Sequence, residues 1–308
     1  MENLLMGSNV KKGDHRQGDD IWGHLRPSSR RRYRDDWNAY RLFCEANGCV
    51  AAPASAETIL AFLKCLFDRK ESFLGIRRKL TVVARVHLQN GHEDPRRHST
   101  IREAVRKLRL ALPPAKVTKP LLIPDLKRVV DGIESSKTRG IRDKAILLLA
   151  FGGALTPREV AELRIDQIRV LDDGLNLNIE EGRTAFVGPG SQERYCVLNA
   201  LNNWFAASAG FGGSVFHQIN RGDNIQIAGL CERSIRTIIN YRIASAGLDG
   251  TGYTACSPRA GHIAEAIRAG INLDVIMRQA GLGSISCLRP YVNMARHLGM
   301  ANLRPLTL

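Results

Sequence analysis

The sequence lacks any long apolar segment. No run of about 18 apolar residues occurs in the 308-residue chain, so no transmembrane helix is predicted. The N-terminal segment MENLLMGSNVKKGDHRQGDD contains no apolar stretch of signal-peptide length, and secretion is therefore not expected. With 44% hydrophobic and 24% charged residues, the composition is that of a globular protein with enough length for two domains.

Cysteine is scarce and unpatterned. The chain has 7 cysteines, an odd number, and no C-x-x-C spacing. This argues against a disulfide framework and a structural zinc site, and it predicts a reducing cytoplasm in which the thiols are mostly small core residues. No metal and no cofactor are expected. The cysteines are Cys44, Cys49, Cys65, Cys196, Cys231, Cys256 and Cys287.

Acidic side chains are too few to balance the basic ones. The 45 Lys and Arg residues against 30 Asp and Glu give a net charge of +15. Residues 1–112 carry 22 basic and 13 acidic side chains (+9), and the remainder carries 23 and 17 (+6). Such an excess favours a polyanionic partner, first of all nucleic acid. Because both halves of the chain are basic, the charge distribution suits two lobes that bind one DNA duplex together. The alternative is a solvated basic surface without a partner.

Prolines divide the chain into two parts. Pro113, Pro114, Pro120 and Pro124 interrupt the periodic pattern and mark a linker. We therefore predict a flexible N-terminus (1–27), a helical domain (28–112), a linker (113–121), a second domain (122–295) and a C-terminal tail (296–308).

The first domain is predicted to hold four helices and no strand. Apolar residues recur at three- and four-residue spacings in residues 28–48, 55–69, 72–91 and 99–112. Ser55 is expected to cap the second helix, Asn90-Gly91 to close the third, and a serine or threonine to open the fourth.

The second domain is predicted to combine helices with a short sheet. Helical patterns cover 124–135, 142–154 and 157–168, and helices are expected again from about residue 199 onward. The segments 175–188 and 191–200 alternate apolar and polar residues around turns, which indicates antiparallel strands. The fold class is thus mainly α with a small antiparallel β-sheet.

The stretch TACSPRAGH, from Thr254 to His262, has the pattern of a helix start. Ser257 is a suitable N-cap and Pro258 a favoured first helical residue, which puts Arg259 at the second position. Its guanidinium and the free N–H groups of that turn would converge on an anion, and a phosphate suits the two-pronged arginine. The alternative is a solvated arginine. Gly270 and Gly281 end this helix and the next, and Tyr291 lies in a third.

These segments carry a family resemblance. Residues 215–292, the segment GGALTPREVAELRIDQI and the helical lobe with RRYRDDWNAYRLFCEANG together resemble the tyrosine recombinases, the phage-integrase family, over about residues 28–300. The resemblance implies that residues 28–112 form a core-binding (DNA-binding) domain and that residues 122–295 form a tyrosine-recombinase-like catalytic domain. Members cut one DNA strand with a tyrosine that forms a 3′-phosphotyrosyl link. Two arginines, a lysine on a β-hairpin and two histidine-type residues assist.

Three of these positions keep a matching or similar residue. Tyr291 matches the nucleophile, and Arg259 matches the arginine of the H-x-x-R motif. Arg183 falls near the hairpin lysine, where it keeps the charge but is a poor proton donor.

Three other positions are substituted. Thr156 stands where the first arginine of R-x-x-E belongs, Cys256 replaces the histidine of H-x-x-R, and Leu282 occupies the later histidine or tryptophan position. Losing one positioned donor commonly costs about 10²–10³ in rate, so strand cleavage is expected to be inefficient.

The resemblance also implies a DNA surface and partner subunits. Basic side chains cluster in two helices of the first domain and are expected to contact phosphates of double-stranded DNA. The tail is expected to dock into a neighbouring recombinase subunit, and a nucleoid-associated, cytoplasmic location without membrane contact follows. The predicted DNA-binding residues are Arg30, Arg31, Arg32, Arg34, Arg77, Arg78, Lys79 and Arg85.

Three functions are compatible with these features. The first is a DNA-binding, catalytically impaired recombinase-like protein that acts as an accessory or regulatory factor at recombination sites or promoters. The second is an active site-specific recombinase or integrase that uses Tyr291. The third is an inert relic with a structural or protein-interaction role.

Overall fold

The chain forms two compact units, Met1–Ala115 and Lys116–Leu308. The computed structural model describes residues 22–23, 27–113, 118–179, 182–248 and 252–297. The predicted flexible N-terminus and the tail expected to dock on a partner lie almost entirely outside the described residues. No helix in the described ranges is long and apolar enough to cross a membrane.

Four α-helices build the described part of the first unit, as the sequence predicts. Ser55 and Ser72 cap the second and third helices by accepting from the N–H groups of Thr58 and Gly75. The fourth helix departs from the prediction, because His98 rather than a serine or threonine is its N-cap residue. The helices are α1 (Pro27–Ala46), α2 (Ala56–Asp68), α3 (Phe73–Gln89) and α4 (Ser99–Ala111).

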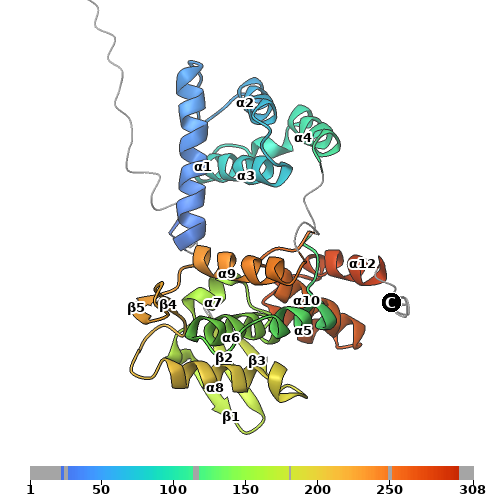
Figure 1. The fold of residues 1–308 in the computed structure, drawn as a ribbon. Coiled ribbons are helices and arrows are strands. Elements are labelled where there is room, and N and C mark those ends of the chain that lie inside the picture. The colour runs from blue at the N-terminus through green and yellow to red at the C-terminus, as the bar shows by residue number, and fades with distance from the viewer. Residues whose placement is uncertain (1–21, 24–26, 114–117, 180–181, 249–251, 298–308) are drawn as a thin grey trace, which may run out of the picture. The chain divides into compact units, whose positions relative to one another are not determined.

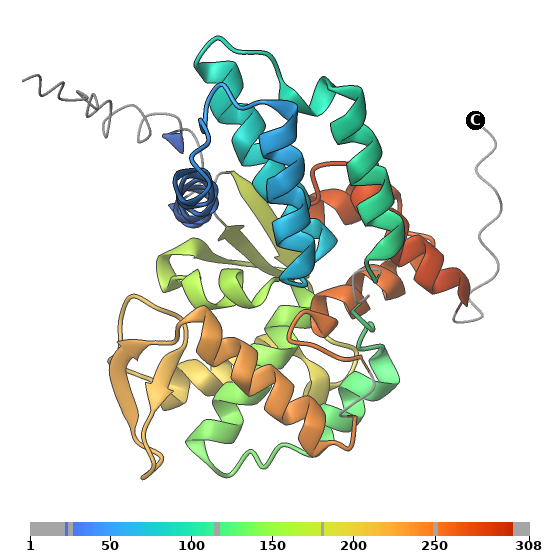
Figure 2. The same cartoon turned by 90° about the horizontal axis from the view of Figure 1, so that it is seen from above.

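Aromatic and aliphatic side chains form the core of this unit. Helix α3 crosses α1 and packs against it (Figure 1), and Figure 2 looks nearly along the α1 axis. Tyr40 of α1 is fully buried, and its ring meets that of Phe62 of α2 edge-on at 4.9 Å. Leu63, Ile76 and other apolar residues complete the cluster. Burial of each such side chain stabilises the unit by roughly 1.5–3 kcal/mol.

Two of the predicted DNA-binding residues also make ion pairs within this unit. Asp36 of α1 is buried, and the guanidinium of Arg78 bonds both its carboxylate oxygens, one of them at 3.0 Å. Lys79 lies 3.0 Å from Glu71 and 3.6 Å from Asp36. Because a buried carboxylate needs such partners, Arg78 and Lys79 join α1 to α3.

The buried His87 of α3 makes the first unit sensitive to acid. Its Nε2 accepts from the N–H of Ala54 at 2.9 Å, so Nδ1 carries the proton and donates to the Val83 carbonyl at 2.8 Å. Burial is the main cause that lowers its pKa below the ordinary 6.5. The unfolded chain therefore takes up a proton before the folded one, and stability is lost as the pH falls below about 6.5.

We expect hydrogen exchange of the α3 amides to accelerate between pH 7 and pH 5, after correction for the intrinsic rate. In His87→Gln the amide side chain can keep both hydrogen bonds without titrating, and the extra pH dependence should shrink. An unchanged pH dependence in that variant would show that another group, such as Asp94, whose pKa is lowered mainly by its hydrogen bond to Arg96, causes the loss.

The second unit contains the remaining elements, in an order that mixes helices with two small sheets. Its helices are α5 (Ile123–Asp131), α6 (Thr138–Gly152), α7 (Pro157–Glu162), α8 (Val197–Ala207), α9 (Glu232–Ser245), α10 (Ser257–Arg268), α11 (Leu273–Ala280) and α12 (Arg289–His297). Its strands are β1 (Ile168–Leu171), β2 (Gly174–Ile179), β3 (Arg183–Val187), β4 (His217–Ile219) and β5 (Ile225–Gly229). The predicted class, mainly α with a small antiparallel sheet, is confirmed.

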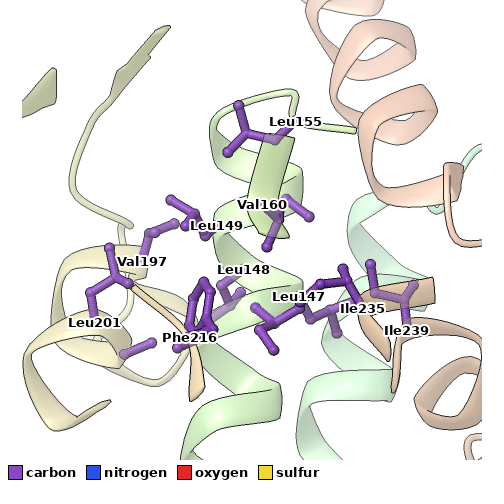
Figure 3. Packing of buried hydrophobic residues seen from close by; sticks show 14 of the residues in the cluster. Leu147, Leu148, Leu149, Leu155, Val160, Val197, Leu201, Phe216, Ile235 and Ile239 are labelled. Atoms are coloured by element: carbon purple, nitrogen blue, oxygen red, sulfur yellow. The ribbon is translucent and has the colours of Figure 1, made fainter. Parts of the chain in front are cut away.

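Helix α6 is the centre of this unit. It lies between α8 and α9 (Figure 1), and its run Leu147, Leu148 and Leu149 is almost wholly buried. Figure 3 shows these leucines meeting side chains of α8 on one side and of α9 on the other. Trp204 of α8 is also fully buried, and its ring N–H donates to the Val215 carbonyl at 2.7 Å. This core fixes the ends of α6 and α7, where the candidate site lies.

The sheet differs from the prediction in two ways. Strands β1, β2 and β3 pair antiparallel in that order. The strand that was expected at residues 191–200 is absent from this sheet, and β1 pairs with β2 in its stead. At the end of that segment and just beyond it, the buried residues Cys196, Val197, Ala200 and Leu201 follow a helical period, and all but Cys196 belong to α8. A second hairpin, β4–β5, was not foreseen.

Candidate functional site

The start of α10 differs from the predicted cap. Cys256 is the N-cap residue and Ser257 the first helical residue. The Ser257 hydroxyl accepts from the Thr254 N–H at 2.8 Å, which places it in the preceding turn rather than over the helix end. Arg259 is therefore the third residue of the helix, and its side chain reaches toward the segment that links α6 to α7.

Arg259 is anchored in a buried position. Only 9% of the residue is exposed, and its Nη1 donates to the Ala154 carbonyl at 2.8 Å. The same nitrogen lies 3.6 Å from Glu159 Oε2 of α7. Burial is the main cause that lowers the pKa of Arg259, while Glu159 raises it, and a guanidinium stays charged in this range. A fixed cation next to a turn is well suited to bind an anion.

Arg183, the first residue of β3, joins Arg259 at the same two acceptors. Its Nη1 donates to Glu159 Oε1, and its Nη2 donates to the carbonyl of Gln279 at 2.7 Å and of Ala154 at 3.4 Å. A Cβ on Gly281 would lie 2.6 Å from Arg183 Cδ and Nε, so only glycine leaves room for this side chain. The structure thus brings two predicted site residues together through Glu159.

Ala154 has an unusual backbone that presents its carbonyl to both arginines. Its φ is +49°, a left-handed value that costs a non-glycine residue roughly 1–3 kcal/mol. Two charged donors on one carbonyl offset that cost. The sequence gives no sign of this conformation, because no local pattern predicts a positive φ at Ala154.

Thr156 and Glu159 form a capping box at the start of α7. The Glu159 N–H donates to Thr156 Oγ1 at 3.2 Å, and the Thr156 N–H donates to Glu159 Oε2 at 2.7 Å. Burial alone would raise the pKa of Glu159, but the Thr156 N–H and the two guanidiniums outweigh it and lower the pKa. Thr156 itself, at the position of the expected first arginine, contributes no charge.

Arg158 does not supply the positive charge that is missing at position 156. It donates through Nε to both carboxylate oxygens of Glu162, at 2.8 and 2.9 Å, along the outer side of α7. The arginine beside Glu159 comes instead from β3.

Tyr291 lies on α12 and packs against the cluster that contains Ala154 and Ile263. Helix α12 packs against α10, the helix that carries Arg259. The structure therefore brings the helix of the candidate nucleophile next to the helix of Arg259. Leu282, which follows α11, packs on the same cluster and offers no polar atom from its side chain.

Cys256 has a cationic neighbour that the sequence analysis missed. Arg236 of α9 pairs with Glu232 at 2.8 Å, and Glu232 first, then Cys256, raise the pKa of Arg236. No local pattern points to Arg236, because α9 and α10 come together only in the tertiary structure. His262, one turn after Arg259, is directed elsewhere: its ring meets Phe151 at 5.9 Å, and burial lowers its pKa.

The predicted DNA-binding residues of the first unit differ in exposure. Arg31, Arg32, Arg34 and Arg77 are exposed. Arg30 bonds the Gly23 carbonyl, Arg78 and Lys79 make the ion pairs described above, and Arg85 buries Nη1.

Helix α4 adds a basic stripe that the sequence analysis did not single out. Arg102, Arg106 and Arg109 are exposed and recur at i, i+4 and i+7, so they share one face of the helix. That spacing was visible in the sequence and could have identified them. No group of three His, Cys, Asp or Glu residues suited to a metal ion occurs among the residues with described positions.

Comparison with known proteins agrees with this architecture. No family model matches the chain. A protein of Selenomonas ruminantium described as an integrase/recombinase xerD homolog is 25% identical over 272 residues, which span 84% of this chain and 80% of that protein.

Solved structures show a shared fold. The Tn1549 transposon integrase in complex with transposon right end DNA has a TM-score of 0.62 at 13% identity, covering 93% of this chain and 99% of that one. A lambda integrase dimer bound to a core site has a TM-score of 0.60 at 14% identity, covering 89% and 92%. The chain is thus similar in sequence, over most of its length, to a protein described as an integrase/recombinase, and it shares the fold of the solved integrases.

Proposed function

We propose that the protein binds double-stranded DNA, holds one backbone phosphate at Arg259 beside Tyr291, and cleaves the strand inefficiently. Its role is that of an accessory or regulatory factor at recombination sites or promoters. One observation carries this proposal: two guanidiniums converge at Glu159 and the Ala154 carbonyl, and α12 with Tyr291 packs against α10, while Cys256 and Leu282 occupy the positions where proton donors are expected.

The charges of the site support phosphate binding. Arg183 and Arg259 bring two positive charges against the single carboxylate of Glu159, which leaves one positive charge for an anion. Both guanidiniums are largely buried, so their field is less screened than at an exposed surface.

The proton-handling groups support slow cleavage. Strand cleavage requires a proton to leave the tyrosine and another to reach the departing 5′ oxygen. A leucine supplies no proton, a thiol is a weak hydrogen-bond donor, and an arginine releases its proton only above about pH 12. Binding therefore persists where catalysis is reduced.

The exposed arginines of α1, α3 and α4 support duplex binding by the first unit. They are suited to contact phosphates rather than base edges, so we expect them to contribute affinity for DNA but little sequence specificity. Assembly with further recombinase subunits through residues 296–308, and a DNA-associated location, complete the proposal.

An active recombinase is the second candidate. Arg183 and Arg259 lie together, and α12, which carries Tyr291, packs against the helix of Arg259, which favours a remaining covalent step. Relaxation of a supercoiled plasmid, with detergent trapping of protein-linked DNA, separates the two functions. A trapped product that forms rapidly and disappears in Tyr291→Phe would establish the active enzyme and contradict slow cleavage.

Binding to a 40-base-pair duplex of mixed sequence tests the DNA-binding part. We expect a sub-micromolar Kd at low salt and a log–log salt slope of about −4 to −6, as for the release of several counterions. Affinity that is weaker than micromolar, or insensitive to salt, would refute DNA binding.

A further inference from the structure

The contacts of Glu159 raise a question about charge. This carboxylate lies next to Arg259, the cation on which phosphate binding is proposed to depend. A carboxylate that pairs with that arginine would cancel its charge and repel a phosphate. Glu159 is nevertheless held in place by the capping box with Thr156, so it cannot turn away without opening the start of α7.

Arg183 resolves this conflict. It contacts Glu159 Oε1 directly, whereas Arg259 stays 3.6 Å from Oε2. Its guanidinium is further held by the carbonyls of Gln279 and Ala154, and Gly281 leaves the space that its side chain needs. Four separate features thus fix Arg183 against Glu159.

We propose that Arg183 acts as the counter-charge of Glu159 and thereby leaves the charge of Arg259 available to a phosphodiester of DNA. Arg183 is then a positioning residue rather than a replacement for the hairpin lysine. It also supplies a positive charge to the site, which Thr156, standing at the position of the expected first arginine, cannot supply. This inference rests on the proposed function of the site, because it assumes that Arg259 binds a phosphate.

The proposal predicts that removing Glu159 compensates for removing Arg183. With both groups neutral, the site again has one net positive charge on Arg259. If Arg183 instead bound the phosphate itself, removing Glu159 would not restore the lost contact. The two roles therefore differ in a double-mutant cycle.

The cycle uses the full chain and inorganic phosphate as the probe, titrated at constant ionic strength and followed by the rise in Tm. The variants are Arg259→Gln, Arg183→Gln, Glu159→Gln and the double variant Arg183→Gln/Glu159→Gln. We expect Arg183→Gln to bind phosphate about tenfold more weakly, the order expected for one partly screened charge. The double variant should return to within about threefold of the wild type.

Two controls keep folding apart from binding. Arg183→Lys keeps the charge and should stay near the wild-type affinity. The far-ultraviolet circular dichroism and the phosphate-free Tm of each variant show whether it folds. Glutamine at position 159 can still accept from the Thr156 N–H, so α7 should keep its cap.

Each outcome has a distinct meaning. Wild-type binding that Arg259→Gln abolishes, together with recovery in the double variant, supports the inference. Arg259-dependent binding without recovery overturns the inference and leaves the proposed function standing. Phosphate binding that is equal in wild type and Arg259→Gln overturns both.

A second measurement identifies the source of the phosphate. Adding the 40-base-pair duplex should displace inorganic phosphate from the Arg259-dependent site, because a DNA phosphate would then occupy it. If phosphate binds equally well with and without saturating duplex, the site serves free phosphate, and the assignment to DNA is wrong.

Discussion

Cys256→His should increase the rate of strand cleavage about 10²-fold, the lower end of what a positioned general acid or base contributes. The imidazole would stand at the N-cap of α10, three residues before Arg259 and near Arg236 of α9. These two cations lower the pKa of an added imidazole, which still offers an N–H to a departing oxygen. The rate is measured by plasmid relaxation and by detergent-trapped protein–DNA product.

Cys256→Gln is the matched control, since glutamine is polar and of similar size but does not titrate. Tyr291→Phe combined with Cys256→His should abolish the product, because the nucleophile is missing. Should Cys256→His leave the rate unchanged while duplex binding is intact, the missing proton donor at this position would not limit cleavage.

Duplex affinity should fall on the order of 10²-fold at 0.1 M salt when Arg102 and Arg106 of α4 are both replaced by glutamine. Each arginine that neutralises one phosphate contributes about 0.9 to the log–log salt slope, so the slope should become shallower by about 2. Glutamine is a good helix former, and α4 should remain folded. Filter binding of the 40-base-pair duplex over a salt series measures both quantities.

The matched control replaces Arg169 of β1 and Arg221 of the β4–β5 turn by glutamine. These two residues are also exposed and give the same change in net charge, but they belong to the second unit. We expect a smaller change in slope from them. An equal loss of affinity in both double variants would mean that net charge, rather than the α4 stripe, controls binding.

Local structure could largely be predicted from the sequence. The four helices of the first unit, the caps at Ser55 and Ser72 and the left-handed stop at Gly281 follow from residue spacing and from residues with one strong preference. The errors occurred where two patterns overlap. Residues 191–200 alternate like a strand, but the buried positions continue into α8 with a helical period.

The identity of the candidate site residues also came from the sequence, because a motif keeps its order along the chain. Their contacts did not. Arg183 meets Glu159 across 24 residues and the Gln279 carbonyl across 96, and Arg259 meets the Ala154 carbonyl across 105. No rule based on neighbours at three or four positions reaches such distances.

The sequence by itself determined the two-part organisation, the basic character, the family resemblance and the substitutions at Thr156, Cys256 and Leu282. The tertiary structure alone decided that Arg183, rather than Arg158, accompanies Arg259, and that both share Glu159 and the Ala154 carbonyl. The physical reason is that charge balance in a buried site depends on which groups the packing of distant segments brings within a few ångströms.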